Sequence, residues 1–413
     1  MFFSRRIFSR NLKDLTRRFY QWEYFWLFLI VIATLTIHFC IINSAPAPVG
    51  DEGYYVKDAR SIIENHETFR IEHPPLAKLL ITAGIKSFGD NPWGWRFFPI
   101  LFSTATIILF YLLCRSLNMS RTAASIATFL LAFENLTFLM GSLAMLDVFF
   151  VTFMMAAFLL YIRQKYAASG TAIALSALAK LNGALSGPAV IIHWFFTQKA
   201  RSKRVLLVIF LAIIVFFLVM IPLDYLITRD VVGSLNPFDD FGTMLSYSQG
   251  VTFHITEQPF KSYPWEWLYR YQAMPFSYAP RYTAAVSFTV FALMIPTFLY
   301  LIYRAAKKDD AALFGAGWFI STYIIWIPAV LLTDRVTYIY YFYPAVGAIC
   351  LGMGIWMSQL LDFFHRRAHG KLKWFALSVV IFVLVAHVFS FLILSPVIQA
   401  DFVKLVGINI IQP

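Results

Sequence analysis

The sequence predicts an all-α fold, a polytopic bundle of transmembrane helices. Of the 413 residues, 60% are hydrophobic and only 14% are charged, and the mean hydropathy of +0.68 is far above that of a soluble domain. Apolar runs long enough to span a bilayer, about 20 residues each, recur along the chain and suggest about eleven crossings. They lie near residues 22–43, 95–114, 121–139, 143–162, 205–227, 282–303, 311–332, 337–361 and 374–396.

Short basic clusters separate these runs and give the expected orientation. The positive-inside rule places such clusters in the cytoplasm, which puts the N-terminus inside and the C-terminus outside. The stretch 170–197 has a cluster on each flank and must therefore cross an even number of times. It is too short for two full spans, so we expect two short helices that meet near Lys180 to Gly183.

This orientation divides one integral membrane domain, residues 1–413, into a few functional parts. The basic residues 1–21 form a cytoplasmic N-terminus that lacks a small-residue cleavage site and is expected to stay attached. Two loops, 44–94 and 228–281, face the outside. Within the first, 53–66 and 75–88 mix charges with apolar residues at helical spacing, as amphipathic surface helices do.

Composition excludes two classes of protein. The net charge of +12 comes from the loop clusters, and no basic groove or stacking module indicates nucleic-acid binding. Cys40, Cys114 and Cys350 all lie inside apolar runs, so they are expected to be small core residues rather than a disulfide framework.

An acidic pair begins the first outer loop. Asp51 and Glu52 stand in "VGDEGYY", and further polar groups follow as Glu72 and His73 in "IEHPPLAK" and Arg96 in "GWRFFP". An acidic pair at the mouth of a membrane helix has to be solvated, paired or functional. The simplest alternative to a catalytic role is that the pair caps the helix that follows it.

Three more ionisable residues fall inside apolar segments, namely Glu134, Asp147 and Lys180. Charges within the membrane are costly and therefore mark either function or internal pairing. In the expected topology all three lie toward the outer half of their helices. They can then converge beneath the first outer loop, or neutralise one another and Arg96.

In this order, these motifs resemble the protein O-mannosyltransferase family of polyprenyl-phosphate-sugar-dependent membrane glycosyltransferases. The resemblance runs from about residue 45 to 350 through "DE", "EHPPLAK", "GWRFFP", "FEN" with "MLD", and "LAKLNG", and continues in "HITEQPFKSYPWEWLYR" and "YIYYFYP". The second outer loop has no room for the large lumenal domain of eukaryotic members. The chain therefore resembles a minimal prokaryotic member.

The resemblance implies roles for individual residues. The first acidic residue of the pair, Asp51, is expected to act as the general base, and Glu52 to orient or bind. An anionic donor phosphate requires cations, for which Arg96, Arg335 and Lys180 are candidates. The expected donor-binding residues are His73, Lys78, Arg96, Asp147, Lys180, Arg335 and Tyr341; those expected to bind acceptor or sugar are Glu72, Glu134, His254, Trp265 and Trp267.

Several of these roles have alternatives that the sequence leaves open. His73 can instead fix its proline-flanked turn, and the two tryptophans can anchor their loop at the headgroup level. Asp51, Glu72 and His254 could gather a divalent metal, although their spacing matches no metal motif and no cofactor is expected.

The expected function is a hexosyltransferase reaction at the outer face of the cell membrane. A polyprenyl- or dolichyl-phosphate sugar, with mannose expected, would be transferred with inversion to Ser/Thr hydroxyls of exported or membrane proteins. One alternative is a glycolipid acceptor, because "DEGYY" and the Pro-Pro-Leu turn are shared with the aminoarabinose transferase of lipid A. A second is a transporter of lipid-linked sugar, although no paired halves are evident.

Overall fold

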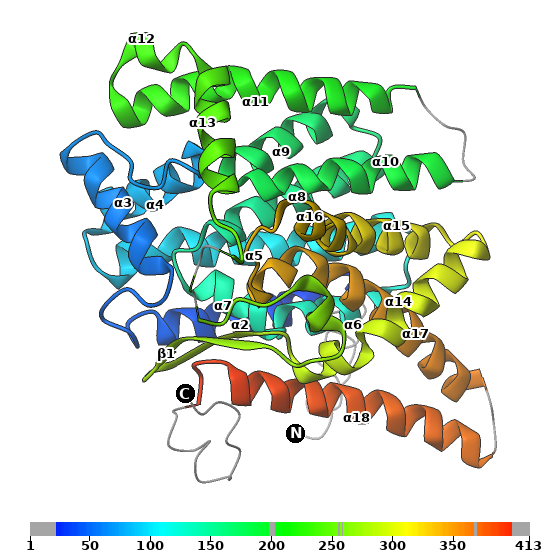
Figure 1. Ribbon diagram of the computed structural model, residues 1–413. Coiled ribbons are helices and arrows are strands. Elements are labelled where there is room, and N and C mark those ends of the chain that lie inside the picture. Colours follow the sequence, from blue (N-terminus) through cyan, green and yellow to red (C-terminus); the bar gives the residue numbers. More distant parts are fainter. Residues whose placement is uncertain (1–21, 198–202, 255–256, 258, 367–369, 399–413) are drawn as a thin grey trace, which may run out of the picture.

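The computed structural model describes residues 22–197, 203–254, 257, 259–366 and 370–398. The basic N-terminus, residues 1–21, lies outside the described residues, as do parts of the clusters near 199–204 and 366–373. The described chain forms one bundle of roughly parallel and antiparallel helices, which run across the view in Figure 1.

Six helical segments are long and apolar enough to cross a membrane, or up to seven if one bent pair counts as a single span. These six are α5 (Pro92–Ser116), α11 (Val205–Thr228), α14 (Phe288–Ala306), Asp310–Thr333, Ile339–Arg366 and α18 (Lys371–Leu394). Asp310–Thr333 comprises α15 (Asp310–Phe319), a π-helical turn (Ile320–Ile324) and α16 (Trp326–Thr333). Ile339–Arg366 comprises a short 3-10 turn (Ile339–Phe342) and α17 (Tyr343–Arg366). The expected count of about eleven crossings is not confirmed by length and composition.

The remaining apolar helices are shorter or bent. The bent pair is α6 (Arg121–Ala132) with α7 (Asn135–Ser142), which meet at 57°. Three others are α2 (Phe25–Ile41), α8 (Leu146–Ile162) and α9 (Tyr166–Ala179). A 3-10 turn, Leu181–Leu185, follows α9 and leads into α10 (Ser186–Phe196). The expectation of two short helices that meet near Lys180 to Gly183 is therefore confirmed.

The two segments that are expected to face the outside, called the outer segments below, fold against one end of the bundle. The amphipathic helices expected in the first segment are present as α3 (Glu52–Glu64) and α4 (Pro75–Phe88). The second contains α12 (Val231–Ser234), α13 (Pro237–Gln249) and a 3-10 turn (Pro264–Leu268), and then an antiparallel hairpin of β1 (Ala273–Tyr278) and β2 (Arg281–Ala285). The fold is mainly helical as predicted, but the run expected at 282–303 begins as β2 and becomes helical only at Phe288.

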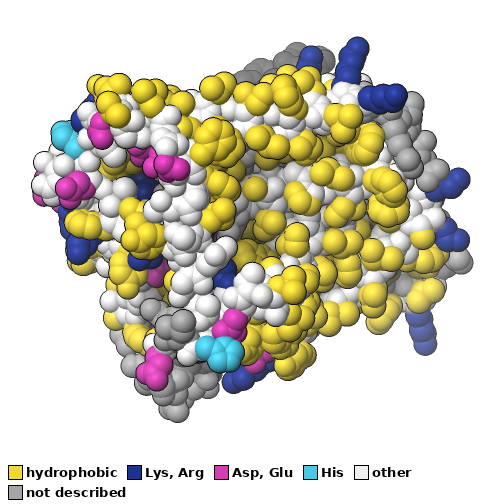
Figure 2. Space-filling view, turned by 45° about the horizontal axis from the view of Figure 1, so that its top comes forward, with side chains coloured by type: hydrophobic (Ala, Val, Ile, Leu, Met, Phe, Trp, Pro, Cys, Tyr) yellow, Lys and Arg dark blue, Asp and Glu magenta, His cyan; other side chains and the backbone are white. Residues whose placement is uncertain are grey.

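Charge differs between the two ends of the bundle. In Figure 2, Lys and Arg side chains project from the right-hand end, where no Asp or Glu is visible. The left-hand half shows both Asp or Glu and Lys or Arg side chains, and apolar side chains cover much of the area between. The left-hand end carries α3, α4 and α13 (Figure 1). This asymmetry agrees with the orientation expected from the basic clusters.

We expect cysteines introduced at Asn65, directly after α3, and at Val232, in α12, to react with a membrane-impermeant maleimide in intact cells, because α3 and α12 lie at the left-hand end (Figure 1). Both side chains are exposed, Val232 by 80%. Gln164, which is exposed at the other end, should react only after permeabilisation. A Cys40→Ser parent removes the exposed native thiol. The reverse labelling pattern would overturn the orientation.

Candidate active site

A pocket of about 410 Å³ lies at the left-hand end, where the two outer segments meet the bundle. Its lining comes from the start of α3 with the residue before it, the loop before α4, the residue after α9, the end of α13 with the loop after it, β1 and the segment before α17. The lining residues are Asp51, Tyr54, Tyr55, Phe69, Arg70, Glu72, His73, Lys180, Tyr247, Ser248, Val251, Met274, Arg335, Val336, Tyr338, Tyr340 and Tyr341. Five expected site residues outside the acidic pair are thus brought together, namely Glu72, His73, Lys180, Arg335 and Tyr341.

The turn before α3 directs Asp51 into this pocket. Gly50 has φ +55°, a conformation that favours glycine, and a Cβ there would lie 2.5 Å from the ring of Phe276 in β1. Asp51 precedes the first helical residue, but its side chain makes no capping hydrogen bond. The capping alternative for Asp51 is therefore wrong.

Asp51 is held by a tyrosine and lies in a half-buried setting. Tyr340 donates a hydrogen bond of 3.1 Å from its hydroxyl to Asp51 Oδ2. Burial raises the pKa of Asp51 above its usual range, while the Tyr340 hydrogen bond and the Lys180 charge oppose that rise. A carboxylate whose pKa is raised toward neutrality is suited to accept a proton.

The loop before α4 is fixed by a buried acid–base pair that does not itself reach the pocket. Asp58, on α3, accepts hydrogen bonds from the Thr68 hydroxyl at 2.9 Å and from the Phe69 backbone N–H at 2.6 Å. Lys78, on α4, donates to Thr68 Oγ1 at 2.7 Å and to the Arg70 carbonyl at 2.9 Å. The donor-binding role expected for Lys78 is not supported, because its ammonium is buried behind the loop that it holds.

Three cations converge around His73 in this pocket, namely Lys180, Arg70 and Arg335. Burial lowers the pKa of His73 well below its usual range, and the charges of Lys180, Lys78, Arg70 and Arg335 lower it further. Burial and four nearby positive charges thus both favour neutral His73, and the three cations that line the pocket outnumber its two carboxylates, Asp51 and Glu72. Such a charge balance suits an anionic ligand.

Two of these cations keep hydrogen-bonding capacity. Arg70 Nε lies 3.1 Å from Glu72 Oε1, and its guanidinium stacks 4.6 Å from the centre of the Tyr54 ring. In the described part of the chain, neither Nη atom of Arg70 donates a hydrogen bond. Arg335 donates from Nη1 to the Ser248 carbonyl, which ties the segment before α17 to the end of α13.

Lys180 lies at the junction of α9 and α10, at the base of the pocket. Its ammonium is 2.9 Å from both Asp147 carboxylate oxygens, and it lies 5.5 Å and 5.4 Å from the ring centres of Tyr340 and Tyr341. Asp147 is buried and does not line the pocket. It therefore supports Lys180 from behind, and no direct donor contact of Asp147 is supported.

Glu52 and Arg96 form a structural pair outside the pocket. Both side chains are 0% exposed, and the guanidinium contacts the two carboxylate oxygens at 2.9 Å and 2.8 Å. Arg96 also donates to the carbonyls of Ile42 and Ala45, while Glu52 accepts from the Ala144 backbone N–H. Neither lines the pocket, so the donor-binding role expected for Arg96 and the active-site role expected for Glu52 are not supported.

Four residues expected to bind acceptor or sugar also lie elsewhere. Glu134 is fully buried, caps α7 through the Thr137 N–H at 2.9 Å and accepts from the Ser287 N–H at 2.9 Å. His254 has an 86% exposed side chain bonded to Asp334. Trp267 is buried and donates to Ser262 Oγ, and Trp265 stacks on Tyr263.

A metal site made by Asp51, Glu72 and His254 is not supported, because His254 lies outside the pocket that Asp51 and Glu72 line. Within the described ranges, no group of three or more His, Cys, Asp or Glu side chains is placed to hold a metal ion.

Sequence reasoning missed Arg70, Asp58 and Tyr340. Arg70 stands only two residues before Glu72 in "FRIEHPP", so its neighbourhood was indicated although the residue was not. Tyr340 lies within "YIYYFYP", where adjacent tyrosines make the pocket-facing member impossible to choose without the fold. Asp58 resembles an ordinary polar residue of an amphipathic helix.

Comparison with known proteins gives a family and several relatives. The model of the family described as dolichyl-phosphate-mannose-protein mannosyltransferase matches residues 27–235. A polyprenol-phosphate-mannose–protein mannosyltransferase of Corynebacterium glutamicum is 35% identical over 149 residues, 32% of this chain and 28% of the relative. The Mycobacterium tuberculosis protein of the same name is 30% identical over 138 residues, 32% and 26%. These matches span about a quarter of the length of those relatives.

Solved structures share the fold at low sequence identity. The Saccharomyces cerevisiae protein O-mannosyltransferase Pmt1–Pmt2 complex bound to its sugar donor matches with a TM-score of 0.70 and 11% identity, over 90% of each chain. ArnT from Cupriavidus metallidurans in the apo state matches with a TM-score of 0.58 and 18% identity, over 88% of this chain and 69% of ArnT. The polytopic membrane architecture is therefore common to all three.

Proposed function

We propose that this chain, which belongs to the dolichyl-phosphate-mannose-protein mannosyltransferase family, transfers mannose from a polyprenyl-phosphate donor to Ser/Thr hydroxyls of proteins. The observation that carries the proposal is the pocket itself, where Asp51 faces Arg70, Arg335 and Lys180. A base beside a cluster of cations provides for both halves of the reaction. The cations hold the phosphate leaving group, and the base activates the acceptor.

Asp51 is the base in this mechanism. Its carboxylate takes the proton of the acceptor hydroxyl while the hydroxyl oxygen attacks the anomeric carbon of mannose. The bond between that carbon and the phosphate oxygen breaks, and polyprenyl phosphate leaves as an anion. One displacement without a covalent sugar–enzyme intermediate inverts the anomeric configuration.

Arg70, Arg335 and Lys180 form the phosphate site. Guanidinium groups bind phosphate oxygens through two parallel hydrogen bonds. His73, which its surroundings keep neutral, can donate one more hydrogen bond without adding charge. These groups stabilise the charge that develops on the leaving phosphate.

The relatives favour a protein acceptor over a glycolipid. Both curated relatives named above are called protein mannosyltransferases and are at least 30% identical over the matched segment, whereas the likeness to ArnT is one of fold alone. The outer face of the cell membrane is the proposed location, because the basic clusters lie at the far end of the bundle. That transfer needs no metal stays a prediction.

Arg70→Lys should lower activity with the lipid-linked donor, because lysine keeps the positive charge but lacks the two Nη groups that can bind two phosphate oxygens at once. We expect kcat/KM for polyprenyl-phosphate-mannose to fall about 10- to 100-fold, the loss of roughly one charge-assisted bond. Arg60→Lys is the matched control, since Arg60 is also on the outer segment but pairs with Asp90 outside the pocket. Equal kinetics in both variants would remove Arg70 from the phosphate site.

Tyr340→Phe should shift the acid limb of the pH–rate profile to higher pH. Activity needs deprotonated Asp51, so it is lost as pH falls through the pKa of that carboxyl, which burial holds above its usual range. Removing the Tyr340 hydrogen bond raises this pKa further. Tyr341→Phe, which makes no such bond, should leave the limb in place. A limb unmoved in Tyr340→Phe would show that it does not report Asp51.

A further inference from the structure

The helix α13 belongs to the second outer segment, but its contacts with α11 put its first turn at a deeper level. At the end of α12, Ser234 donates a hydrogen bond of 3.0 Å to Asp224 Oδ2, near the outer end of α11. In the first turn of α13, the Phe238 ring stacks on Phe217 of α11, with 4.4 Å between the ring centres. Phe217 precedes Asp224 by seven residues. A helix rises about 1.5 Å per residue, so the chain descends about 10 Å along α11 between these two contacts.

The level of Asp224 marks the outer limit of the apolar part of α11. This helix of 24 residues is long and apolar enough to cross a membrane. Asp224 is its first charged residue, and every residue before it is apolar. Because charged side chains are costly within the hydrocarbon region, Phe238 lies on the membrane side of this limit. In Figure 1, α13 crosses α11, which it contacts, whereas α12 lies nearer the left-hand end.

One side of α13 is apolar and open. Phe238 and Leu245, which we call the apolar stripe, are seven residues apart and therefore lie on the same side of the helix. They stay 66% and 39% exposed within the described part of the chain. On one flank of this stripe, Pro237 and Met244 are buried against the protein.

The other flank of the apolar stripe is polar. Asp239, Thr243 and Ser246 recur at helical spacing and are all exposed. Asp239 also lies in the first turn, where a negative charge is favourable. A helix with protein on one flank, water on the other and an apolar stripe between them has the pattern of a helix that lies in the plane of a membrane surface.

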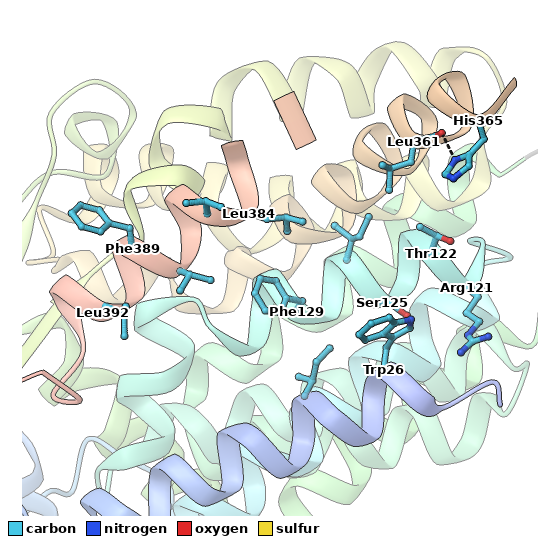
Figure 3. Close-up of a pocket in the computed structure, with 14 residues that line it drawn as sticks. Trp26, Arg121, Thr122, Ser125, Phe129, Leu361, His365, Leu384, Phe389 and Leu392 are labelled. Atoms are coloured by element: carbon cyan, nitrogen blue, oxygen red, sulfur yellow. Dashed lines mark hydrogen bonds between the residues drawn. The ribbon is translucent and has the colours of Figure 1, made fainter. Parts of the chain in front are cut away.

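The apolar stripe continues the lateral surface of α11. Leu218, which follows the stacked Phe217, is 61% exposed. Exposed apolar surface elsewhere on the bundle follows the long helices. An example is the cavity of about 980 Å³ between α2, α6, α17 and α18, which Phe129, Phe389 and Leu392 line (Figure 3). α13 differs because it crosses a span rather than running along it.

We propose that α13 is an interfacial helix whose apolar stripe contacts the acyl chains of the outer-leaflet lipids. Lipid is the occupant because the stripe joins the lateral surface of a membrane span below the level of Asp224. The helix then connects the lipid with the active-site pocket, since Tyr247 and Ser248 line that pocket and Arg335 donates to the Ser248 carbonyl. This placement is independent of the reaction that the pocket catalyses.

Spin labels on the full chain in phosphatidylcholine vesicles test the proposal. Phe238→Cys and Leu245→Cys are each made in a Cys40→Ser parent, whose two other cysteines are buried. Electron paramagnetic resonance then measures how often each label collides with molecular oxygen, which enters lipid, and with a water-soluble nickel chelate. Thermal unfolding shows that each labelled variant is folded.

Three further positions supply matched references for these labels. Leu218→Cys, on the exposed side of α11, reports the lipid, and Asn65→Cys, directly after α3, reports water. Ser246→Cys is the control on α13 itself, because it follows Leu245 by one residue but lies on the polar flank.

We expect the labels at Phe238 and Leu245 to collide mainly with oxygen, as at Leu218, and to lie about 5–10 Å below the headgroup boundary. The labels at Ser246 and Asn65 should collide mainly with the nickel chelate. Chelate-dominated collisions at both Phe238 and Leu245 would overturn the proposal. So would low collision rates with both reagents, or spin–spin broadening that unlabelled protein removes on dilution, because either would show that protein covers the stripe.

Discussion

Asp51→Asn should lower transfer by about 100-fold or more while leaving the fold and donor binding intact. A positioned general base contributes about 10²–10⁴ in rate. Asparagine keeps the shape of the side chain and can still accept the hydrogen bond from Tyr340. Only the proton acceptor is lost, so the effect falls on kcat rather than on donor affinity.

Single-turnover transfer from polyprenyl-phosphate-mannose to a serine peptide measures this effect. Asp90→Asn is the matched control, because Asp90 is an acidic residue of the same outer segment that pairs with Arg60 at the surface. Detergent-solution melting confirms that each variant is folded. Turnover near the wild-type value in Asp51→Asn would end the catalytic assignment.

Glu52→Gln should destabilise the protein far more than expected for a residue at the start of a predicted surface loop, because the Glu52 side chain is fully buried. The substitution leaves Arg96 buried without its counterion, and breaking a buried pair in this way costs about 3–5 kcal/mol. The carboxylate also accepts the Val49 and Ala144 backbone N–H groups, which ties the start of α3 to the turn between α7 and α8.

Chemical or thermal unfolding in detergent measures this loss. Arg60→Gln supplies the comparison, since the Arg60–Asp90 pair is 41% and 45% exposed and such pairs contribute about 0–1 kcal/mol. The refolded fraction of Glu52→Gln should keep a near-normal chemical step. A stable Glu52→Gln protein with greatly reduced turnover would instead place Glu52 in the reaction.

The sequence predicted most of the helices because hydropathy and helical spacing are local signals. The two surface helices, α3 and α4, and the break near Lys180 are examples. The hairpin of β1 and β2 was missed, because each strand has six residues or fewer and an aromatic-rich stretch shows no clear alternation. The number of membrane spans could not be predicted either, because the sequence does not show whether a bent or short apolar helix crosses the membrane.

The pocket could be predicted only in part. His73, Lys180 and Arg335 were singled out and do line it with Asp51, although their roles stay predictions. Arg96 shows why the rest failed. A charged residue at the start of a span shows that a charge has to be accommodated at that level of the membrane, which costs free energy. It does not show in which direction the side chain points. Its partner, Glu52, is 44 positions away, and two charges that neutralise each other look the same in sequence as two that act.

The most direct test of the account is whether the purified chain chemically consumes a lipid-linked sugar. Polyprenyl-phosphate-mannose and a serine/threonine peptide are incubated with the protein in detergent, and mannosyl peptide and polyprenyl phosphate are both quantified by mass spectrometry. The account predicts that the two products form in equal amounts and that both fall by about 100-fold or more with Asp51→Asn. Intact donor, together with protein-dependent movement of that donor across vesicle membranes, would contradict it and identify a transporter instead.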